Sequence, residues 1–258
     1  MADISSRVHG IRALENLSAG KTAIHRLHPL TKLLSAFIII VITASFGRYE
    51  FARLAPFLFY PFILMALAEL PYKLLLSRAL IALPFCLFAG ITNVIIDREA
   101  AFVVGGIMIS YGVLSLITIL LKVYLCVMAA LILVATTPFT ELTAQLRRLR
   151  IPVVLVMVFE MTYRYIGVLF EEVRSMMTAY RLRSGNRRSI DIRHMGPFAG
   201  HLIIRGFDRA ERVHAAMRCR GYSLREFPRA RRSFRIADSL ALAVVCIPAL
   251  LLRLLVVI

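Results

Sequence analysis

The feature that most constrains this chain is the separation of its apolar residues from its charged ones. Five apolar stretches lie between residue 33 and the C-terminus, whereas residues 139–236 hold 20 Lys and Arg against 8 Asp and Glu, a net charge of +12. A helix of a water-soluble domain keeps one polar face, and these stretches have almost none. The pattern therefore predicts helices in a bilayer, joined to a basic module at its inner face.

Charged residues bound each apolar stretch and set its length. The stretches are Leu33–Gly47, Leu54–Ala68, Ala79–Ile96, Ala100–Leu121 continued by Val123–Thr140 beyond Lys122, and Ser239–Leu252. A spanning helix needs about 20 apolar residues, and about 17 is the usual minimum. The first two stretches are shorter, but the flanking Lys32, Arg48 and Arg53 can extend to the interface and restore the length.

Composition excludes several other classes of protein. The 258 residues are 59% hydrophobic and carry a formal charge of +17, whereas ordinary globular chains are about 45–50% apolar. Four cysteines without a CxxC pair exclude a disulfide scaffold and a zinc ribbon. We find no signal peptide, because the first apolar run begins near Leu33 and no small-residue cleavage site follows it.

The distribution of Lys and Arg predicts both the orientation and the number of spans. Short cytoplasmic loops are enriched in these residues, so the N-terminal segment and the basic block should both be cytoplasmic. An even number of spans must then separate them. Residues 100–140 therefore supply one crossing, roughly Tyr111–Thr136, after an outer loop or lead-in at Phe102–Ser110. Lys73 and Arg78 are expected in the inner loop between spans two and three.

The predicted fold class is an all-α integral membrane protein with about five transmembrane helices, rather than six, and a cytoplasmic module of long amphipathic helices. Residues 1–29 form a cytoplasmic N-terminal segment and residues 30–137 a four-span transmembrane region. Residues 138–236 form the cytoplasmic module, and residues 237–258 a C-terminal transmembrane helix. The C-terminus is then expected outside the cell.

Proline and glycine divide the basic block into three predicted helices. The first runs from Pro138 to Arg150, and the second begins at Pro152 and ends at Ser184, with Glu160 and Arg164 spaced for an ion pair. The third begins at Pro197 and ends before a glycine. Its expected apolar stripe consists of Phe198, Leu202, Phe207, Ala210, Val213 and Met217.

The second and third helices finish with the same pattern, Ala-x-Arg-x-Arg followed by a small residue. The arginines are Arg181 and Arg183 in one and Arg218 and Arg220 in the other, 37 residues further along. One explanation is that arginine is abundant here and suits the negative end of a helix dipole. The other is that an arginine at an exposed helix end, beside a glycine that admits another backbone, docks into an acidic groove.

Several segments together carry a resemblance to a known family. They are Leu27–Leu34 (LHPLTKLL), Thr136–Leu142 (TTPFTEL), Leu149–Pro152 (LRIP), Thr162–Tyr165 (TYRY), and the motifs Leu182-Arg183-Ser184 and Cys219-Arg220-Gly221. In this order they resemble the transmembrane T component of energy-coupling factor (ECF) transporters, the EcfT/CbiQ family, over nearly the whole chain. The family commonly has alanine before each motif arginine, where this chain has Leu182 and Cys219.

The resemblance implies a multi-pass scaffold of the plasma (inner) membrane that is not an enzyme and holds no cofactor or metal. Two ATPases of the ATP-binding cassette class would dock on the cytoplasmic helices, and a substrate-binding membrane subunit would lie against the other side. Cobalt, nickel or a vitamin would be the cargo. The ATPase-docking residues would be Arg183, Arg220, Leu182, Ser184, Cys219 and Gly221, supported by Arg181 and Arg218.

Two other functions remain open from the residues alone. A self-sufficient secondary carrier needs ionisable groups at the membrane midplane, and Lys122 is the only charge well inside a predicted crossing. An integral-membrane enzyme acting on a lipid phosphate would need an interfacial cluster, for which Asp191 with His194 is a poor candidate. Nucleic acid is not an expected partner, because positive charge beside a membrane needs no nucleic acid to explain it.

Three further polar residues allow alternative interpretations. His25 and His28 are spaced for one helical turn and form either a metal-binding pair or, as we favour, a structural feature before the first span. Lys122 is either a functional intramembrane charge or a side chain that reaches the interface or pairs with a neighbouring helix.

Overall fold

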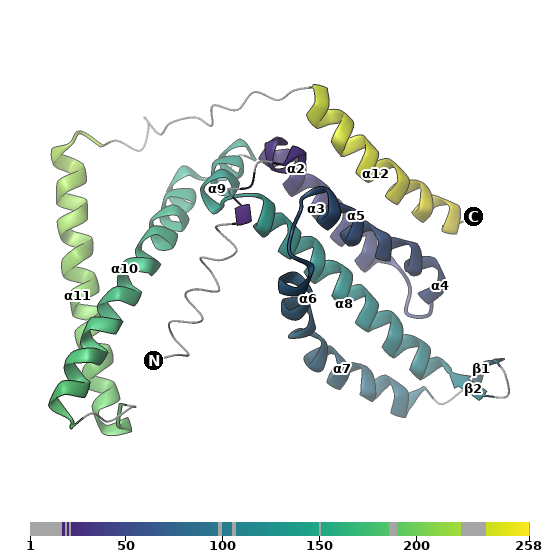
Figure 1. Ribbon diagram of the computed structural model, residues 1–258, viewed down its shortest axis with the longest axis horizontal. Helices are drawn as coiled ribbons and strands as arrows, with labels where there is room; N and C mark the ends of the chain where they lie inside the picture. The colour runs from purple at the N-terminus through teal and green to yellow at the C-terminus, as the bar shows by residue number, and fades with distance from the viewer. Residues whose placement is uncertain are drawn as a thin grey trace. The chain divides into compact units, whose positions relative to one another are not determined.

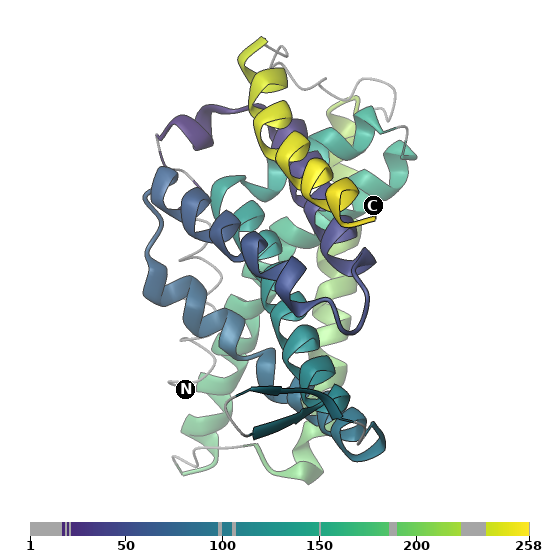
Figure 2. The ribbon, with the colours of Figure 1, turned by 90° about the vertical axis from the view of Figure 1, so that its right-hand side faces the viewer.

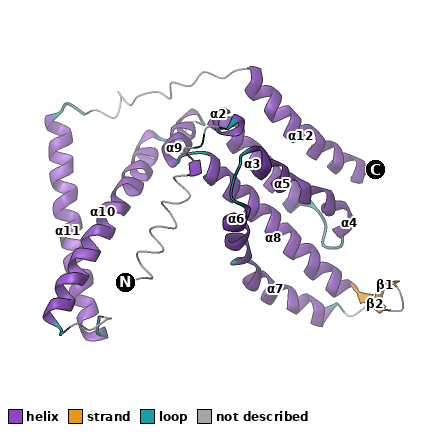
Figure 3. Cartoon of the chain, viewed as in Figure 1, coloured by secondary structure: helices purple, strands orange, loops and turns teal. Residues whose placement is uncertain are grey.

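The computed structural model describes residues 17–18, 20, 22–97, 100–104, 107–149, 151–185, 190–222 and 236–257. Their regular secondary structure is helical apart from one short hairpin (Figures 1 and 3). The elements are α2 (Ala23–Arg26), α3 (Pro29–Ser45), α4 (Phe51–Leu54), η1 (Ala55–Leu58), α5 (Phe59–Leu67), α6 (Tyr72–Leu80), α7 (Leu83–Ile96), β1 (Ala100–Val104), β2 (Ile107–Ser110), α8 (Tyr111–Thr136), α9 (Phe139–Arg148), α10 (Val153–Arg183), α11 (Ile192–Cys219) and α12 (Ile236–Val257).

The chain divides into two compact units, which we describe separately. The apolar unit contains the described residues up to residue 142 together with α12, and the basic unit contains the described residues from 143 to 222. Among the described residues, the chain thus leaves the apolar unit within α9 and is again part of it at α12.

Helix α8 is the centre of the apolar unit, where it contacts α3, α4, α5, α6 and α7, while α12 lies along α3 (Figure 2). Met65, Leu75 and Met128 form one fully buried cluster around it. Helices in lipid associate through close packing rather than through the hydrophobic effect. Gly112 allows such an approach, because a Cβ there would lie only 2.7 Å from the Asn93 carbonyl oxygen of α7.

Large apolar side chains also point outward from the apolar unit. Phe85 is 82% exposed, and Ile81 and Phe88 are similarly open. Exposed apolar side chains around a buried core are typical of a surface that lipid covers. Together with the apolar helices, this surface identifies a membrane protein.

Length and composition identify the helices that can cross a membrane. Among the described residues, α8 and α10 qualify alone, and α6 with α7 qualifies as a pair bent by 43°. The predicted crossing at Tyr111–Thr136 coincides with α8. Shorter apolar helices occupy Pro29–Ser45, Phe51–Leu67 and Ile236–Leu251. The count of five spans and the side of the membrane that each region faces stay predictions.

Two parts of the predicted membrane region are wrong in detail. Lys73 and Arg78 lie in helix α6 rather than in a loop, and a break after Leu80 interrupts the predicted third span. Pro84 explains the break, because it has no N–H for the Leu80 carbonyl and its ring collides with that group. The outer loop at Phe102–Ser110 falls largely within an antiparallel hairpin of β1 and β2.

The basic unit is built on α10 and α11, which run antiparallel in Figure 1. The first two predicted helices of the basic block are confirmed as α9 and α10. The third begins at Ile192, so the prediction that Pro197 starts it is wrong. Asp191 is its N-cap residue, with the His194 N–H donating to the Asp191 carbonyl at 2.9 Å.

The predicted apolar stripe of α11 is correct at four positions and wrong at two. Phe198, Leu202, Val213 and Met217 are half-buried, whereas Phe207 is 70% exposed and Ala210 is also exposed. The spacing explains the difference, because the step of five residues from Leu202 turns a helix by about 140° beyond a full turn. Gly206 and Arg209 occupy the half-buried face instead.

Candidate functional site

Each arginine motif lies at the end of a long helix that a left-handed glycine terminates. Arg183 is the last residue of α10, Ser184 is the C-cap, and Gly185 follows with φ of +67°. Arg220 is the C-cap of α11, and Gly221 has φ of +69°. A residue with a Cβ is sterically strained in this left-handed conformation, which accounts for glycine at both positions.

The end of α11 has the two hydrogen bonds of a Schellman motif. The Tyr222 N–H donates to the Met217 carbonyl at 3.0 Å, and the Gly221 N–H donates to the Arg218 carbonyl at 3.0 Å. These bonds satisfy carbonyls that a helix end would otherwise leave unpaired. The direction in which the chain leaves α11 is therefore fixed beside Arg220.

The two arginines differ by one residue in their position relative to the helix end. Arg183 lies two residues before its left-handed glycine, whereas Arg220 lies directly before Gly221. One residue turns a helix by about 100°. The motifs that repeat at 37 residues in the sequence therefore present their guanidinium groups differently around the two helix axes.

Most of the predicted docking residues lie on the surface. Arg183, Arg218, Cys219, Arg220 and Gly221 are exposed, and Leu182 is 83% exposed. Ser184 and Arg181 are half-buried, and the Arg181 Nε has no hydrogen-bond partner among the described residues. No described residue forms an ion pair or hydrogen bond with the Arg183 or Arg220 side chain. Both guanidinium groups are thus available to an external acceptor.

Because α10 and α11 are antiparallel, the two arginines lie toward opposite ends of the hairpin that these helices form (Figure 1). The 28 residues of α11 extend about 42 Å at about 1.5 Å per residue. The structure therefore does not bring the two motifs together. It presents them as two separate sites.

Polar contacts near the middle and base of the hairpin join α10 to α11. Glu172 pairs with Arg205 and, at 3.8 Å, with Arg209. Tyr180 and His194 approach to 3.3 Å between the hydroxyl oxygen and Nδ1. Exposed pairs of this kind each contribute little to the stability of the folded protein, about 0–1 kcal/mol. The hairpin consequently has a weak interface, and of the residues described in α10 and α11 only Val156 is buried.

Helix α9 is joined to α10 by a tighter polar cluster. The Thr143 hydroxyl donates to Glu160 Oε1 at 2.9 Å, and Arg147 Nη2 donates to the same oxygen at 2.7 Å. Glu160 therefore pairs with α9, and the expected pair with Arg164 is wrong. Burial and the nearby Glu160 carboxylate raise the pKa of Tyr222, next to the α11 motif, above its ordinary value. The end of α11 therefore lies within electrostatic range of the α9–α10 cluster.

A groove between α10 and α11 has a volume of about 350 Å³. Its lining includes Met157, Met161 and Met217 with Tyr165 and His214. Methionine side chains adapt to differently shaped partners. The groove is wide open at the surface of the basic unit, and its chemistry is apolar with a few polar groups at the edge.

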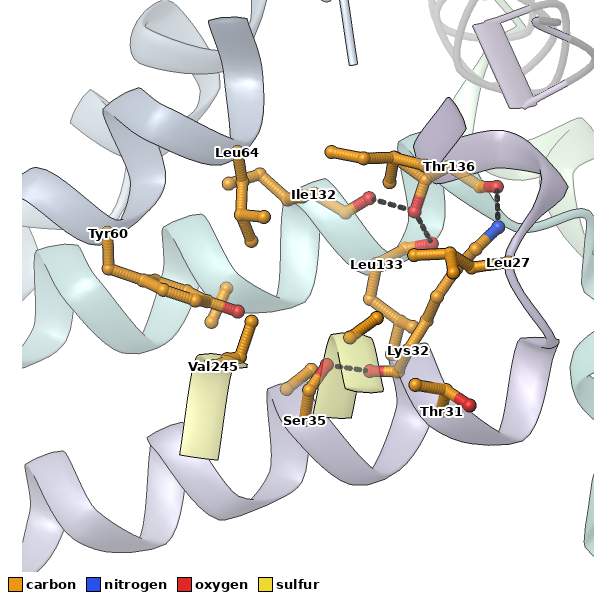
Figure 4. Close-up of a pocket in the computed structure, with 14 residues that line it drawn as sticks. Leu27, Thr31, Lys32, Ser35, Tyr60, Leu64, Ile132, Leu133, Thr136 and Val245 are labelled. Carbon is orange, nitrogen blue, oxygen red and sulfur yellow. Dashed lines mark hydrogen bonds between the residues drawn. The ribbon is translucent and has the colours of Figure 1, made fainter. Parts of the chain in front are cut away.

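The apolar unit contains a buried polar junction that sequence reasoning missed. We use this name for His25, His28, Lys32, Thr136 and Asp238. The Lys32 ammonium donates to the Thr136 carbonyl at 2.9 Å (Figure 4). It also donates to the His25 carbonyl at 3.1 Å. The His28 N–H donates to Asp238 Oδ1 at 2.8 Å. The only signal in the sequence is a charged residue at the edge of each of two apolar runs.

The His25 imidazole makes two hydrogen bonds close to α2. Nε2 donates to the Leu17 carbonyl at 3.0 Å, and Nδ1 lies 2.7 Å from the Thr22 hydroxyl oxygen. Burial, followed by the positive charge of Lys32, lowers the pKa of His25 below its ordinary value. His28 caps α3 instead, with Nδ1 accepting from the Leu30 N–H. The rings of both histidines therefore contact groups of the protein itself, as the structural interpretation predicts.

Lys122, the charge inside the predicted fourth span, binds the end of α3. Its ammonium donates to the Phe46 carbonyl and, at 3.4 Å, to the Ala44 carbonyl. Arg253 of α12 reaches the same helix end, donating to the Ser45 carbonyl at 3.0 Å and lying 4.8 Å from the centre of the Phe46 ring. The alternative in which Lys122 pairs with a neighbouring helix is confirmed.

Comparison with known proteins assigns this arrangement to a family. The profile of the cobalt transport protein family CbiQ matches residues 20–230. The chain is 28% identical to the energy-coupling factor transporter transmembrane protein EcfT of Limosilactobacillus fermentum over 254 residues, 89% of this chain and 92% of that protein. It is 35% identical to the cobalt transport protein CbiQ of Rhodobacter capsulatus over 91 residues, 35% and 37% of the two chains. It is also 30% identical to an uncharacterized protein of Methanocaldococcus jannaschii, over 62% of this chain and 59% of that protein.

Proposed function

The chain belongs to the CbiQ family of cobalt transport proteins, and on that basis we propose that it is the scaffold and energy-coupling subunit of an ECF-type importer. In this role it links two cytoplasmic ATPases of the ATP-binding cassette class to a substrate-binding membrane subunit. The chain itself is not a catalyst. When the ATPase pair closes around ATP, the helices of the basic unit move, and the apolar unit passes that motion to the substrate-binding subunit.

The observation that carries this proposal is the pair of exposed arginine-bearing helix ends. Arg183 and Arg220 have no partner among the described residues and are separated by about the length of α11, roughly 42 Å. One acidic groove cannot hold both side chains at that separation. Two docked subunits, each receiving one arginine, match the geometry.

The chemistry of an arginine at these positions suits an acidic groove. A guanidinium presents a planar fork of donors to carboxylates, and such charge-assisted pairs are about twice as strong as neutral hydrogen bonds. Gly221 and Ser184 add little bulk beside the arginines, and a Cβ built on Gly185 or Gly221 meets no atom within 4 Å. The surroundings of both helix ends are therefore open to the backbone of a partner.

The proposed cargo is cobalt or nickel, with a vitamin as the alternative. The family name and the CbiQ relative favour cobalt, whereas relatives that align over most of both chains carry the general EcfT name. Substrate recognition would lie in the separate membrane subunit, so this chain would serve more than one cargo without changes to its own residues.

The carrier alternative loses its main candidate residue. A self-sufficient carrier needs an intramembrane charge that faces its substrate. Lys122 instead donates to carbonyls at the end of α3, which commits the ammonium to a helix contact. This observation favours the energy-coupling role over the carrier.

Charge reversal at both helix ends tests the proposal. We expect Arg183→Glu with Arg220→Glu to abolish capture of the co-expressed ATP-binding cassette ATPases from detergent, because each docking contact becomes a repulsion. The matched control is Arg193→Glu with Arg212→Glu, which reverses two exposed charges in the same unit and should capture the ATPases normally. Both variants must insert at wild-type yield. Wild-type capture by the first double variant refutes ATPase docking at these sites.

A further inference from the structure

Within the part of the chain that the structure describes, two links between the units are both held by the start of helix α3. The described chain leaves the apolar unit after α8, within α9, and is again in the apolar unit at α12. The last residue of α8 is Thr136, and Asp238 lies in the first turn of α12. Lys32 and His28, one helical turn apart at the start of α3, bind these two residues. One short segment therefore contacts both helices of the apolar unit, α8 and α12, that flank the basic unit among the described residues.

The first contact fixes the end of α8. The Lys32 ammonium donates to the Thr136 carbonyl at 2.9 Å (Figure 4). It also donates to the His25 carbonyl at 3.1 Å. Carbonyls at a helix C-terminus lack intrahelical partners and carry partial negative charge, so a cation is stabilised there. The Thr136 hydroxyl donates back to the Ile132 carbonyl at 2.8 Å, which leaves the main-chain carbonyl to Lys32.

The second contact fixes the start of α12. The His28 N–H donates to Asp238 Oδ1 at 2.8 Å. His28 is also the N-cap of α3, so the Asp238 carboxylate lies at the positive end of that helix dipole, where an anion is stabilised. A single carboxylate thus joins the first turn of α12 to the first turn of α3.

These groups are buried, which makes the contacts hard to exchange for water. Lys32 is 7% exposed, Asp238 6%, Thr136 2% and His28 1%. A charge removed from water is tolerated only where other groups satisfy it. The junction is therefore a rigid point at which neither link can shift without breaking a charged contact, unlike the weakly joined α10–α11 hairpin.

We propose that the buried polar junction anchors both links, and that Lys32 and Asp238 are positioning residues that pass motion of the basic unit to the helices of the apolar unit. This inference rests on the proposed function, because it assumes that ATPases move the basic unit. A pull on α9 or on the first turn of α12 reaches the same segment of α3, so both movements act on the apolar unit together.

Hydrogen exchange in the complete complex tests the inference without knowledge of the cargo. The complex of the full chain with its co-expressed ATPases is compared in nanodiscs without nucleotide and with ADP and vanadate. In the wild type we expect nucleotide to change amide exchange in α10 and α11 and also in α3 and α12. In Lys32→Met the change in α10 and α11 should persist. The change in α3 and α12 should fall about tenfold, the size of a typical coupling between sites.

The control variants separate positioning from simple stability. Lys32→Arg keeps a buried cationic donor and should restore the change in α3 and α12. Lys73→Met removes an exposed cation from the same unit and should behave as the wild type. If Lys32→Met does not assemble, Asp238→Asn carries the test, with a smaller loss in the same direction.

The outcomes distinguish this inference from the proposed function. A wild type that captures no ATPase, or shows no nucleotide-dependent change in α10 and α11, overturns the proposed function and the inference with it. A Lys32→Met complex that transmits the change to α3 and α12 as the wild type does overturns the inference alone. Failure of Lys32→Arg to restore transmission also overturns it.

Discussion

At the scale of single residues, the charges of the apolar unit bind helix ends. Asp238 lies at the start of α3, and Lys122 with Arg253 lies at its end. Free N–H groups give a helix start partial positive charge and free carbonyls give its end partial negative charge. Each charged side chain therefore meets the helix end of opposite sign. Helix α3 is fixed at both ends by side chains from α8 and α12.

The sequence reveals the charges of this arrangement but not their partners. Lys32 and Lys122 are visible as interruptions of apolar runs, and the local pattern offers either interfacial or functional roles for Lys122. Their acceptors are main-chain carbonyls, which no residue type marks. His28 and Asp238 are 210 residues apart, so only the folded chain brings them together.

The buried imidazole of His25 predicts a loss of stability in acid. Its pKa in the folded protein is lowered, so the unfolded chain binds the proton more readily. The contribution of His25 is then fully present above its ordinary pKa of 6.5 and is lost as the pH falls below that value. We expect the thermal midpoint of the detergent-solubilised protein to fall less between neutral and mildly acid pH in His25→Gln than in the wild type.

A second histidine provides the control for this experiment. His201 of α11 is exposed, so His201→Gln should keep the pH dependence of the wild type. Equal pH dependence of the His25→Gln variant and the wild type would show that protonation of this imidazole does not oppose folding.

At the scale of elements, three helix ends in the described part of the chain use a residue in left-handed conformation, and one of these residues is not glycine. Glu69 follows α5 with φ of +52°, and the Leu70 and Glu69 N–H groups donate to the Met65 and Ala66 carbonyls in the Schellman pattern. The same conformation has glycine after α10 and α11. The turn after α5 therefore stores strain that the other two do not.

This difference predicts stability changes of opposite sign. Glu69→Gly should stabilise the protein by up to about 1 kcal/mol, because relief of left-handed strain exceeds the entropy cost of glycine. Gly221→Ala should destabilise it by about 1 kcal/mol for the converse reason. Chemical unfolding in mixed micelles measures both changes.

Gly200 provides a matched control within α11. It is helical, and a Cβ there meets no atom within 4 Å, so Gly200→Ala should stabilise the helix by about 1 kcal/mol. Destabilisation by Gly200→Ala and Gly221→Ala alike would show that backbone conformation is not what requires glycine at position 221.

Long periodic elements are predictable from this sequence, and short corrections to them are not. Helix α8 has the predicted bounds because a long apolar run, interrupted at Lys122 alone, and Ser110 as N-cap define it locally. The bend between α6 and α7 depends on Pro84, and the length of the apolar run does not reveal it. Helix α11 begins before Pro197 because Asp191 supplies an earlier N-cap. The arginine motifs were predictable as helix ends, but their offset of one residue appears only in the caps.

At the scale of the whole molecule, the direction of α10 and α11 links membrane topology to function. Helix α10 is long and apolar enough to cross a bilayer, although the distribution of charge predicts a cytoplasmic location. The two arginine motifs lie toward opposite ends of the α10–α11 hairpin. If α10 crossed the membrane, Arg183 and Arg220 would face opposite sides, and two cytoplasmic ATPases could not hold both.

Labelling of single cysteines at the two helix ends tests the central claim most directly. Cys219 is exposed beside Arg220, and Ser184→Cys places a thiol beside Arg183. Each is examined in a chain whose other cysteines (Cys86, Cys126, Cys246 and, for the second, Cys219) are replaced by alanine. We predict that a membrane-impermeant maleimide labels both thiols in inside-out vesicles, labels neither in intact cells, and is blocked at both by bound ATPases. Labelling of either thiol from outside the cell, or full labelling with ATPases bound, contradicts the account.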